Sequence, residues 1–151
     1  MQFTREKIWD LWGEAWPLLM EHWQEIARYK DIKLNPDFDA YHDAEMNGLL
    51  RVYTARAEGL LIGYAAFFVK KNAHYKDSLQ AVQDVVFLRK ECRRGFVGIK
   101  LLEYADAQLA NEGVQVVYQH VKVRNNFSPI LKRIGYEKVE EVWAKRLDVK
   151  G

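Results

Sequence analysis

The sequence predicts an α/β protein in which helices cover a mixed β-sheet, and three observations predict this class. Apolar residues recur at spacings of three and four within residues 4–29, which is the period of an amphipathic helix. Residues 50–88 contain the alternating and continuous apolar runs that are typical of half-buried and fully buried strands. Beyond residue 97 a helical pattern is followed by another apolar run, which predicts parallel strands joined by a right-handed crossover.

The first helix is expected over residues 4–29, with Thr4 as its cap. Its apolar stripe consists of Trp9, Trp12, Trp16, Leu19, Trp23 and Ile26. Pro17 interrupts this stripe and should kink the helix or divide it in two. A second helix is expected to follow Asn35-Pro36-Asp37 and to run to about Met46.

The middle of the chain is expected to be β-structure. Residues 50–57 and 60–69 flank the turn Glu58-Gly59 and predict a β-hairpin whose second strand is buried on both faces. A polar loop at residues 70–78 then leads to a buried strand over residues 81–88.

A helix is expected from Gly98 until the sequence Asn-Glu-Gly at residues 111–113 ends it. A strand over residues 114–123, a short helix over residues 126–134 and a final strand over residues 139–147 complete the expected order. The whole predicts a mixed sheet with helices on its faces.

Length and composition predict one domain over residues 1–151. A formal net charge of +2 gives no global field that would attract nucleic acid or an acidic membrane. The single cysteine excludes an intrachain disulfide, and neither a signal pattern nor a membrane-length apolar run is found, so a cytoplasmic location is expected. The four histidines and one cysteine show no metal-ligand spacing, so no metal is expected.

Residues 91–102 read E-C-R-R-G-F-V-G-I-K-L-L and join a buried strand to a helix. The first turn of a helix leaves N–H groups without partners, and they lie at the positive end of the helix dipole. Gly95 and Gly98 permit backbone conformations and close approaches that a Cβ would block. Arg93 and Arg94 add charged donors. The segment therefore fits a phosphate site, although an ordinary surface turn fits the same residues.

The segment matches neither G-x-x-x-x-G-K-[ST] nor G-x-G-x-x-G. Over residues 90–102 it resembles motif A of the GNAT superfamily of acyl-CoA-dependent N-acyltransferases, typically P-E-Y-R-G-K-G-I-G-K-x-L-L. Residues 125–136, N-N-F-S-P-I-L-K-R-I-G-Y, are similar to the family's second signature, N…A…L-Y-E-K-L-G-F, and the resemblance covers about 100 of the 151 residues. It implies the GNAT fold: N-terminal helices, a mixed and mostly antiparallel sheet with helices on both faces, and a parallel β-α-β core.

A narrower pattern resembles a subgroup often found in bacteriophage genomes: N-x-H-Y, then D-x-x-x-x-P-x-x-R-x-G-x-x-G, then H-V-K, then L-x-x-x-G-Y. The matching residues are Asn72, His74, Tyr75, Asp84, Arg93, Gly95, Gly98, His120, Val121, Lys122, Leu131, Gly135 and Tyr136. This resemblance implies a phage-encoded enzyme in the host cytoplasm.

The chain departs from the family pattern at three positions. Phe96 replaces the central glycine of R-x-x-G-x-G, and Gly95 stands one position earlier, so the residue with positive φ is expected to be shifted. Lys90 replaces the proline before the loop. Leu131 stands where many members have a tyrosine that acts as general acid, so another group or solvent must supply that proton.

An amine that attacks a thioester needs an unprotonated nitrogen, a polarised carbonyl and a proton for the departing thiolate. Asp84 lies in an otherwise apolar strand, where a carboxylate is either a hydrogen-bonded core acid or a functional base or amine-binding anion. His120 is a second candidate base, because histidine is a common proton acceptor in proteins, or else a satisfied strand histidine. His74 and Tyr75 belong to a loop that is expected to overhang the acceptor site, or else to be merely solvated. These four residues are the candidate catalytic residues.

The resemblance implies that acetyl-CoA is the cosubstrate and that the backbone N–H of Leu88 or a neighbour binds the acetyl oxygen. The implied cofactor-binding residues are Phe87, Leu88, Arg93, Arg94, Gly95, Phe96, Val97, Gly98, Ile99 and Asn125. Arg93 and Arg94 would face the pyrophosphate or the 3′-phosphate, unless the arginine cluster is only a solvated patch. Asn125 would bind the pantetheine arm, unless it caps the next helix.

The resulting hypothesis is an N-acetyltransferase that moves an acetyl group from acetyl-CoA directly to a primary amine of a small molecule or protein. A non-catalytic GNAT-fold protein that binds acyl-CoA or a host partner is the first alternative, because it accounts for Leu131 and Phe96. A small nucleic-acid-binding module is the second, and the low net charge disfavours it. The tryptophans of the first helix fit core and lid packing, a homodimer surface or an aromatic wall of the acceptor pocket. The fold does not identify the acceptor.

Overall fold

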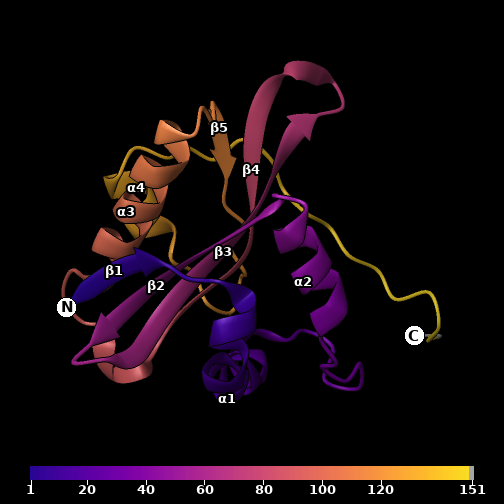
Figure 1. Cartoon of the computed structure of the whole chain (residues 1–151). Helices are drawn as coiled ribbons and strands as arrows, with labels where there is room; N and C mark the ends of the chain where they lie inside the picture. Colours follow the sequence, from indigo (N-terminus) through magenta and orange to yellow (C-terminus); the bar gives the residue numbers. More distant parts are fainter. Residues whose placement is uncertain (150–151) are drawn as a thin grey trace.

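The computed structural model describes residues 1–149 and contains a five-stranded sheet with helices around it (Figure 1). The strands are β1 (Gln2–Arg5), β2 (Leu50–Ala57), β3 (Leu60–Asn72), β4 (Tyr75–Leu88) and β5 (Val116–Tyr118). The helices are α1 (Ile8–Ile26), α2 (Phe38–Met46), α3 (Val97–Asn111) and α4 (Ser128–Arg133), with a 3₁₀ turn at Lys90–Cys92.

The strands lie in the order β1-β2-β3-β4-β5. The pairs from β1 to β4 are antiparallel, while β4 and β5 are parallel and are joined through α3. The predicted mixed, mostly antiparallel sheet with a parallel β-α-β unit is therefore confirmed.

The N-terminal residues form a strand, contrary to the prediction that the first helix begins there. Thr4 pairs with Thr54 of β2, so it does not cap the helix. Helix α1 begins instead at Ile8, whose backbone N–H donates to both carboxylate oxygens of Glu45, at 3.0 and 2.9 Å. A carboxylate of α2 therefore stabilises the start of α1 and ties the two helices together.

Helix α1 continues through Pro17 as one element of 19 residues, so the predicted division into two helices does not occur. The side chains that it buries are those of Ile8, Leu11, Ala15, Leu18 and His22. This stripe is rotated from the predicted one, and Trp9 remains 65% exposed. No helix within the described residues is long and apolar enough to cross a membrane.

Strands β3 and β4 form a longer hairpin than predicted. Most of the loop expected at residues 70–78 is strand, and Asn72 pairs with Tyr75 at the tip. The tip projects beyond the helices, which explains why polar residues can form strand there (Figure 1).

Strand β4 contains one residue more than β3 near its middle. Ala66 pairs with Val85 and Phe67 pairs with Gln83, so Asp84 has no partner on β3 and forms a β-bulge. A bulge bends the strand locally and redirects the side chains that follow it.

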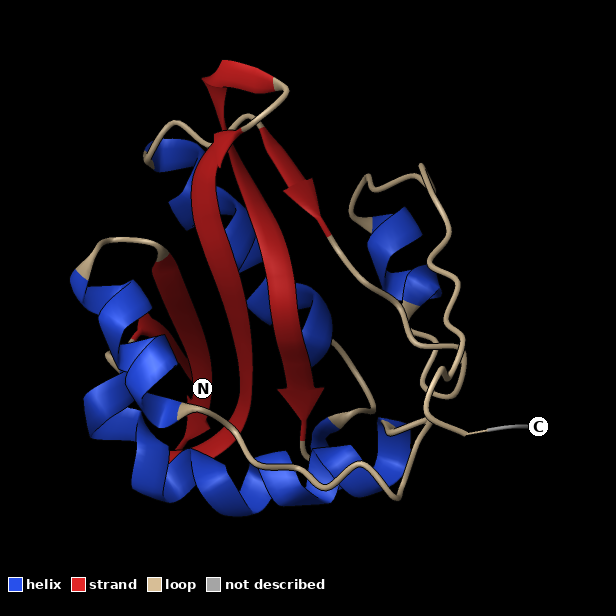
Figure 2. Cartoon of the chain, turned by 90° about the vertical axis from the view of Figure 1, so that its right-hand side faces the viewer, coloured by secondary structure: helices blue, strands red, loops and turns tan. Residues whose placement is uncertain are grey.

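Two hydrophobic clusters lie on opposite faces of the sheet, which confirms the prediction of helices on both faces (Figure 2). The cluster under α3 includes Tyr53, Ala65, Phe67, Leu101, Leu102, Ala105, Leu109 and Leu131. The cluster under α1 includes Leu11, Leu18, Leu50, Val52, Tyr64 and Phe87.

The C-terminal part of the described chain contains less strand than predicted. The strand expected over residues 114–123 is limited to β5, and residues 139–147 form no strand. The large apolar side chains of this segment are exposed: Val139 65%, Val142 77%, Trp143 86% and Leu147 88%. Arg146 pairs with Asp31 at 2.9 Å and lies over the ring of Tyr29. These contacts hold the segment beside the α1–α2 connection and away from β5 (Figure 1).

Buried His22 predicts a loss of stability in mild acid. The side chain is 5% exposed, and its ring lies 5.0 Å from that of Phe87. Burial lowers the pKa of His22 from 6.5 to about 4, because desolvation disfavours the charged form. Below about pH 6.5 the unfolded chain takes up a proton that the folded chain does not accept until about pH 4. The free energy of unfolding should therefore fall by on the order of 2–3 kcal/mol across that window.

Urea unfolding of wild type and His22→Gln at pH 7 and pH 4.5 tests this expectation. The variant should lose less stability between the two pH values than wild type does. His74→Gln, which changes an exposed histidine, is the matched control and should behave as wild type. Parallel losses in wild type and His22→Gln would contradict the assignment.

Candidate functional site

Helix α3 begins at Val97, after a loop in which Gly95 has φ = +92°. The predicted shift of the positive-φ residue to Gly95 is therefore confirmed. Phe96 is the N-cap residue and makes no side-chain hydrogen bond to the helix. The N–H of Lys100 donates to Phe96 O at 2.9 Å, and the N–H groups of residues 97–99 have no acceptor within residues 1–149. Free amides at the positive end of a helix are suited to binding a phosphate.

The two arginines of this loop differ in their contacts. The Nε of Arg93 donates to Leu88 O at 2.7 Å, and its guanidinium pairs with Glu25 of α1 at 2.9 Å. Arg93 therefore anchors the loop to β4 and α1, and its predicted contact with a phosphate stays a prediction. Arg94 is exposed and makes no hydrogen bond or ion pair with the described part of the chain, so its side chain is available to an anion.

The end of β4 presents backbone N–H groups to a gap in the sheet. Arg89 N–H donates to Ile62 O at 2.8 Å, and Leu88 pairs with Gly63. In an antiparallel ladder, a hydrogen bond between the neighbours Arg89 and Ile62 means that Leu88 and Gly63 form a non-hydrogen-bonded pair. The N–H of Leu88 therefore points away from β3. On that side β5 pairs with β4 only at residues 80–82, and the two strands then separate (Figure 2). The Leu88 amide therefore faces the space between them.

Val86 precedes Leu88 by two positions, so its N–H has the same orientation. Along the strand Val86 lies about 7 Å from Asp84, so Val86 is closer to Asp84 than Leu88 is. Two amides of β4 are therefore directed into the gap.

A side chain connects β4 to the chain after β5. Gln83 is 8% exposed, and its Oε1 accepts a hydrogen bond from the His120 N–H at 2.7 Å. This bond replaces a backbone ladder bond where the strands begin to separate. Gln83 is not among the residues predicted from the sequence, although a glutamine within a buried apolar strand is a signal of such a role. His120 itself is exposed and makes no side-chain hydrogen bond within residues 1–149.

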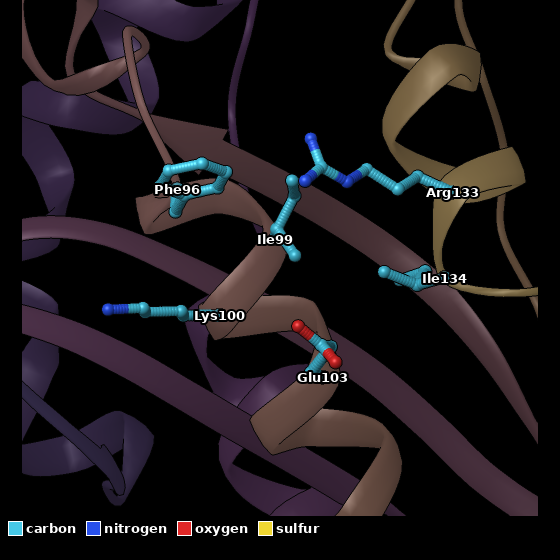
Figure 3. A pocket seen from close by; sticks show the side chains of 6 residues that line it. All are labelled: Phe96, Ile99, Lys100, Glu103, Arg133 and Ile134. Carbon is cyan, nitrogen blue, oxygen red and sulfur yellow. The ribbon is translucent and has the colours of Figure 1, made fainter.

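A pocket of about 240 Å³ lies between α3 and α4, and Figure 3 shows its side chains. Its lining residues are Phe96, Ile99, Lys100, Glu103, Arg133 and Ile134. The guanidinium of Arg133 lies 5.2 Å from the centre of the Phe96 ring. A cation and an aromatic face therefore lie together near the start of α3. Sequence reasoning missed Lys100 and Arg133, because they come from polar faces of two helices that only the fold brings together.

Asp84, the extra residue of the β4 bulge, is in contact with helix α2. Its Oδ2 accepts a hydrogen bond from Tyr41 OH at 2.8 Å. Burial raises the pKa of Asp84 above its usual range, and the Tyr41 hydrogen bond opposes that rise. The residue nevertheless keeps access to solvent. A carboxylate with a raised pKa at a solvent-accessible position is a suitable proton acceptor for an ammonium group.

A larger cavity of about 400 Å³ adjoins Asp84 on the α1 and α2 side of the sheet. Its aromatic lining residues are Trp12, Trp16, Trp23, Tyr41 and Tyr64. Asp84 and Val85 both line it although they are consecutive, and a regular strand would point them to opposite faces. The bulge is therefore what places the carboxylate in this cavity.

The structure does not bring His74 and Tyr75 to the other candidate residues. They lie at the tip of the β3–β4 hairpin, where Tyr75 is 64% exposed and the His74 N–H donates to Asn72 Oδ1 at 2.8 Å. Tyr75 precedes Asp84 by about 30 Å along the extended strand. Their catalytic role stays a prediction without geometric support in this chain.

Asn125 lies in a turn that its N–H closes by donating to Lys122 O at 3.1 Å. Helix α4 begins at Ser128, whose N–H donates to Asn126 Oδ1 at 2.9 Å. Asn126, and not Asn125, therefore satisfies the start of α4, and a contact between Asn125 and pantetheine stays a prediction. Leu131 is 6% exposed and packs in the core under α3.

Known structures share this architecture. A ribosomal-protein-alanine N-acetyltransferase from Brucella melitensis biovar Abortus 2308 superposes with a TM-score of 0.73 at 15% identity, covering 97% of this chain and 100% of that chain. A predicted acetyltransferase with acetyl-CoA from Clostridium acetobutylicum gives 0.72 at 13% identity, covering 97% and 96%. The chain has a GNAT-like fold.

The GNAT-like fold is not confined to structures described as acetyltransferases. A transcriptional regulator from Bacillus halodurans C-125 superposes with a TM-score of 0.76 at 12% identity, covering 97% of this chain and 100% of that chain. The sequence matches no protein-family model and no curated protein. At these identities the similarity establishes the fold and leaves the activity to be argued from the site.

The contact between Gly63 and the end of β4 predicts that a methyl group there disturbs the site. A Cβ on Gly63 would lie 2.7 Å from Leu88 Cδ1 and 2.8 Å from the backbone oxygen of Phe87. Gly63→Ala should therefore displace the end of β4 and cost about 1–3 kcal/mol of unfolding free energy.

Gly13→Ala is the matched control, because a Cβ on Gly13 of α1 meets nothing within 4 Å. It should raise the unfolding free energy by about 0.5–1 kcal/mol, as expected for glycine within a helix. Urea denaturation measures both changes. A Gly63→Ala protein as stable as wild type would show that the end of β4 can move freely.

Proposed function

We propose that the protein is an N-acetyltransferase that transfers an acetyl group from acetyl-CoA directly to a primary amine. The observation that carries this proposal is the arrangement along one strand, β4. The loop after it leads to the free amides of residues 97–99, its end directs the Val86 and Leu88 amides into the gap, and Asp84 faces a cavity. The GNAT-like fold supports the same activity.

Acetyl-CoA would be held by groups on three elements. Its pyrophosphate would bind the amides of residues 97–99, with Arg94 supplying a positive charge. Lys100 and Arg133 would receive the phosphate of the adenosine end. The pantetheine arm would lie in the gap beside Leu88, where a strand edge has unpaired amides.

The chemistry forms a C–N bond and breaks the C–S bond of the thioester. Asp84 would accept a proton from the ammonium form of the acceptor, directly or through water. The free amine then attacks the carbonyl carbon, and the N–H of Val86 or Leu88 would donate to the oxygen on which negative charge develops. The nitrogen loses a second proton to solvent as the bond forms. The departing thiolate takes its proton from solvent, because Leu131 has none to give.

A GNAT-fold protein that binds acyl-CoA or a protein partner without catalysis is the second candidate. The burial of Leu131 favours it, since the position of the usual family acid is filled by core packing. Where the second candidate also binds CoA, release of free thiol with a panel of amines separates the two. Absence of thiol release with every amine, while CoA still binds, would favour the second candidate.

Finer features of the proposal rest on sequence alone. The four short motifs suggest a phage-encoded enzyme, which would act in the host cytoplasm. We infer that one domain over residues 1–151 carries the activity, and a homodimer is compatible with it.

Arg94→Ala should weaken CoA binding. Loss of one charge-assisted contact to phosphate costs about 1–3 kcal/mol, which is roughly a 5- to 150-fold rise in Kd by calorimetry. Arg5→Ala is the control, since it removes the same charge from β1, the strand at the opposite edge of the sheet from β5. If both variants bind CoA as wild type does, Arg94 does not belong to the site.

Tyr41→Phe should shift the acid limb of the pH–rate profile. The hydroxyl lowers the pKa of Asp84, so its removal leaves burial unopposed and raises that pKa further. Asp84 then becomes protonated at a higher pH than in wild type. As the pH is lowered, kcat should therefore begin to fall at a higher pH. The measurement is kcat against pH with an amine that supports thiol release.

Two further variants complete this comparison. Asp84→Asn should lower kcat by about 10²- to 10⁴-fold and change CoA affinity little. Tyr136→Phe removes a different tyrosine-to-carboxylate hydrogen bond, from Tyr136 OH to Asp106 Oδ1 of α3 at 2.7 Å, and should leave the profile as in wild type. An acid limb that does not move in Tyr41→Phe would exclude Asp84 as the titrating base.

A further inference from the structure

The cavity beside Asp84 is lined mainly by apolar and aromatic side chains. These include Trp12, Trp16, Leu19, Trp23, Val52 and Ala66. Its volume of about 400 Å³ lies toward the small end of the range for small-molecule sites, which is about 300–1,000 Å³. Such walls stabilise an apolar body, and beyond the indole N–H groups they give no hydrogen bonds to a body covered with hydroxyl or ammonium groups.

Oxygen atoms that can accept hydrogen bonds are contributed to the cavity by the sheet, through Tyr64 and Asp84, and by Tyr41 of α2. Tyr41 donates its only proton to Asp84, so its oxygen remains free to accept a hydrogen bond. Tyr64 is 4% exposed, and its hydroxyl has no partner within residues 1–149. A buried hydroxyl without a partner is rare, because its desolvation is not compensated. A ligand N–H that points to Tyr64 would supply the missing partner.

A primary ammonium group fits these oxygens well. It carries three N–H donors, and the carboxylate of Asp84 with the hydroxyls of Tyr41 and Tyr64 provides acceptors in the same cavity. Trp12 and Trp16 also line the cavity, and aromatic rings favour both a cation and the apolar groups attached to it.

The charges of the cavity favour a single cation. Among its lining residues Asp84 is the one carboxylate and Lys33 the one cationic side chain. A second ammonium group would therefore find no second carboxylate and would be repelled by Lys33.

From this arrangement we infer that the acceptor is a monoamine that carries its primary ammonium group on a flat apolar body, such as an arylalkylamine. The inference rests on the proposed function, of which it names the substrate class. Polyamines and aminosugars are excluded as good acceptors, because their additional polar groups would lose hydration against the tryptophan walls.

Three probes test the inference on the wild-type protein: 2-phenylethylamine, its neutral analogue 2-phenylethanol, and the polyamine spermidine. Calorimetry should show that 2-phenylethylamine binds at least about tenfold more tightly than either of the others. With acetyl-CoA present, 2-phenylethylamine should also give the fastest release of free thiol.

Two tryptophans of α1 provide a matched pair of variants. Trp16 lines the cavity, whereas Trp9 does not line it and packs on Phe38 with ring centres 5.6 Å apart. Trp16→Ala should raise the Kd for 2-phenylethylamine about tenfold without changing CoA affinity, and Trp9→Ala should leave both within about twofold. Asp84→Asn should abolish the preference for 2-phenylethylamine over 2-phenylethanol. Melting temperatures show whether each variant is folded. If a variant does not fold, the comparison of the three probes on the wild-type protein still tests the inference.

The outcomes separate this inference from the proposed function. If 2-phenylethylamine binds as expected and no amine releases thiol, the cavity assignment is supported and the acetyltransferase proposal fails. If spermidine is acetylated while 2-phenylethylamine neither binds nor reacts, the acetyltransferase proposal is supported and the monoamine inference is overturned. Equal binding of 2-phenylethylamine and 2-phenylethanol would also overturn it, because the ammonium group would then contribute nothing.

Discussion

Between the pairs Phe67–Gln83 and Ala66–Val85, strand β4 contains one residue more than β3, and Asp84 is that residue. Side chains alternate along a regular strand, so only this irregularity lets Asp84 and Val85 face the same cavity. The same region is where β5 stops pairing with β4 and where the Gln83 side chain takes over the contact. The carboxylate on one face thus follows from the bulge in β4, and the free amides at the edge follow from the early end of the pairing with β5.

The sequence predicts the centre of the fold well, because each central element is long enough to display its period. Strand β2 and helix α3 fall close to the expected residues, and β3 and β4 contain the expected apolar runs but extend into the loop expected at residues 70–78. Strand β1 was missed, since four residues are too few to show alternation and Thr4 also fits a helix cap. The strand predicted over residues 139–147 is wrong for a different reason. These residues have a strand pattern, but Arg146 holds them beside Asp31, and no strand edge pairs with them in the described structure.

For the candidate site, the sequence indicates the groups whose chemistry is local. Asp84 is conspicuous as a charge within an apolar run, and the shift of positive φ to Gly95 follows from Phe96 in the next position. Groups that depend on tertiary contacts escape sequence reasoning. Tyr41 lies on α2, and nothing in its neighbourhood along the chain indicates a hydrogen bond to β4. Arg93 shows the same limit, because its ion pair with Glu25 comes from packing against α1.

The exposed side chains of the C-terminal segment make this part of the molecule sensitive to its surroundings. Transfer of a large apolar side chain from water to a nonpolar contact is worth roughly 1.5–3 kcal/mol. Val142, Trp143 and Leu147 together therefore represent several kcal/mol, comparable to the whole margin by which a small domain stays folded, about 5–15 kcal/mol. Crowding, detergents and protein concentration all change how favourable it is to leave these apolar side chains in water. The conformation of residues 139–147 in solution should therefore depend on these conditions.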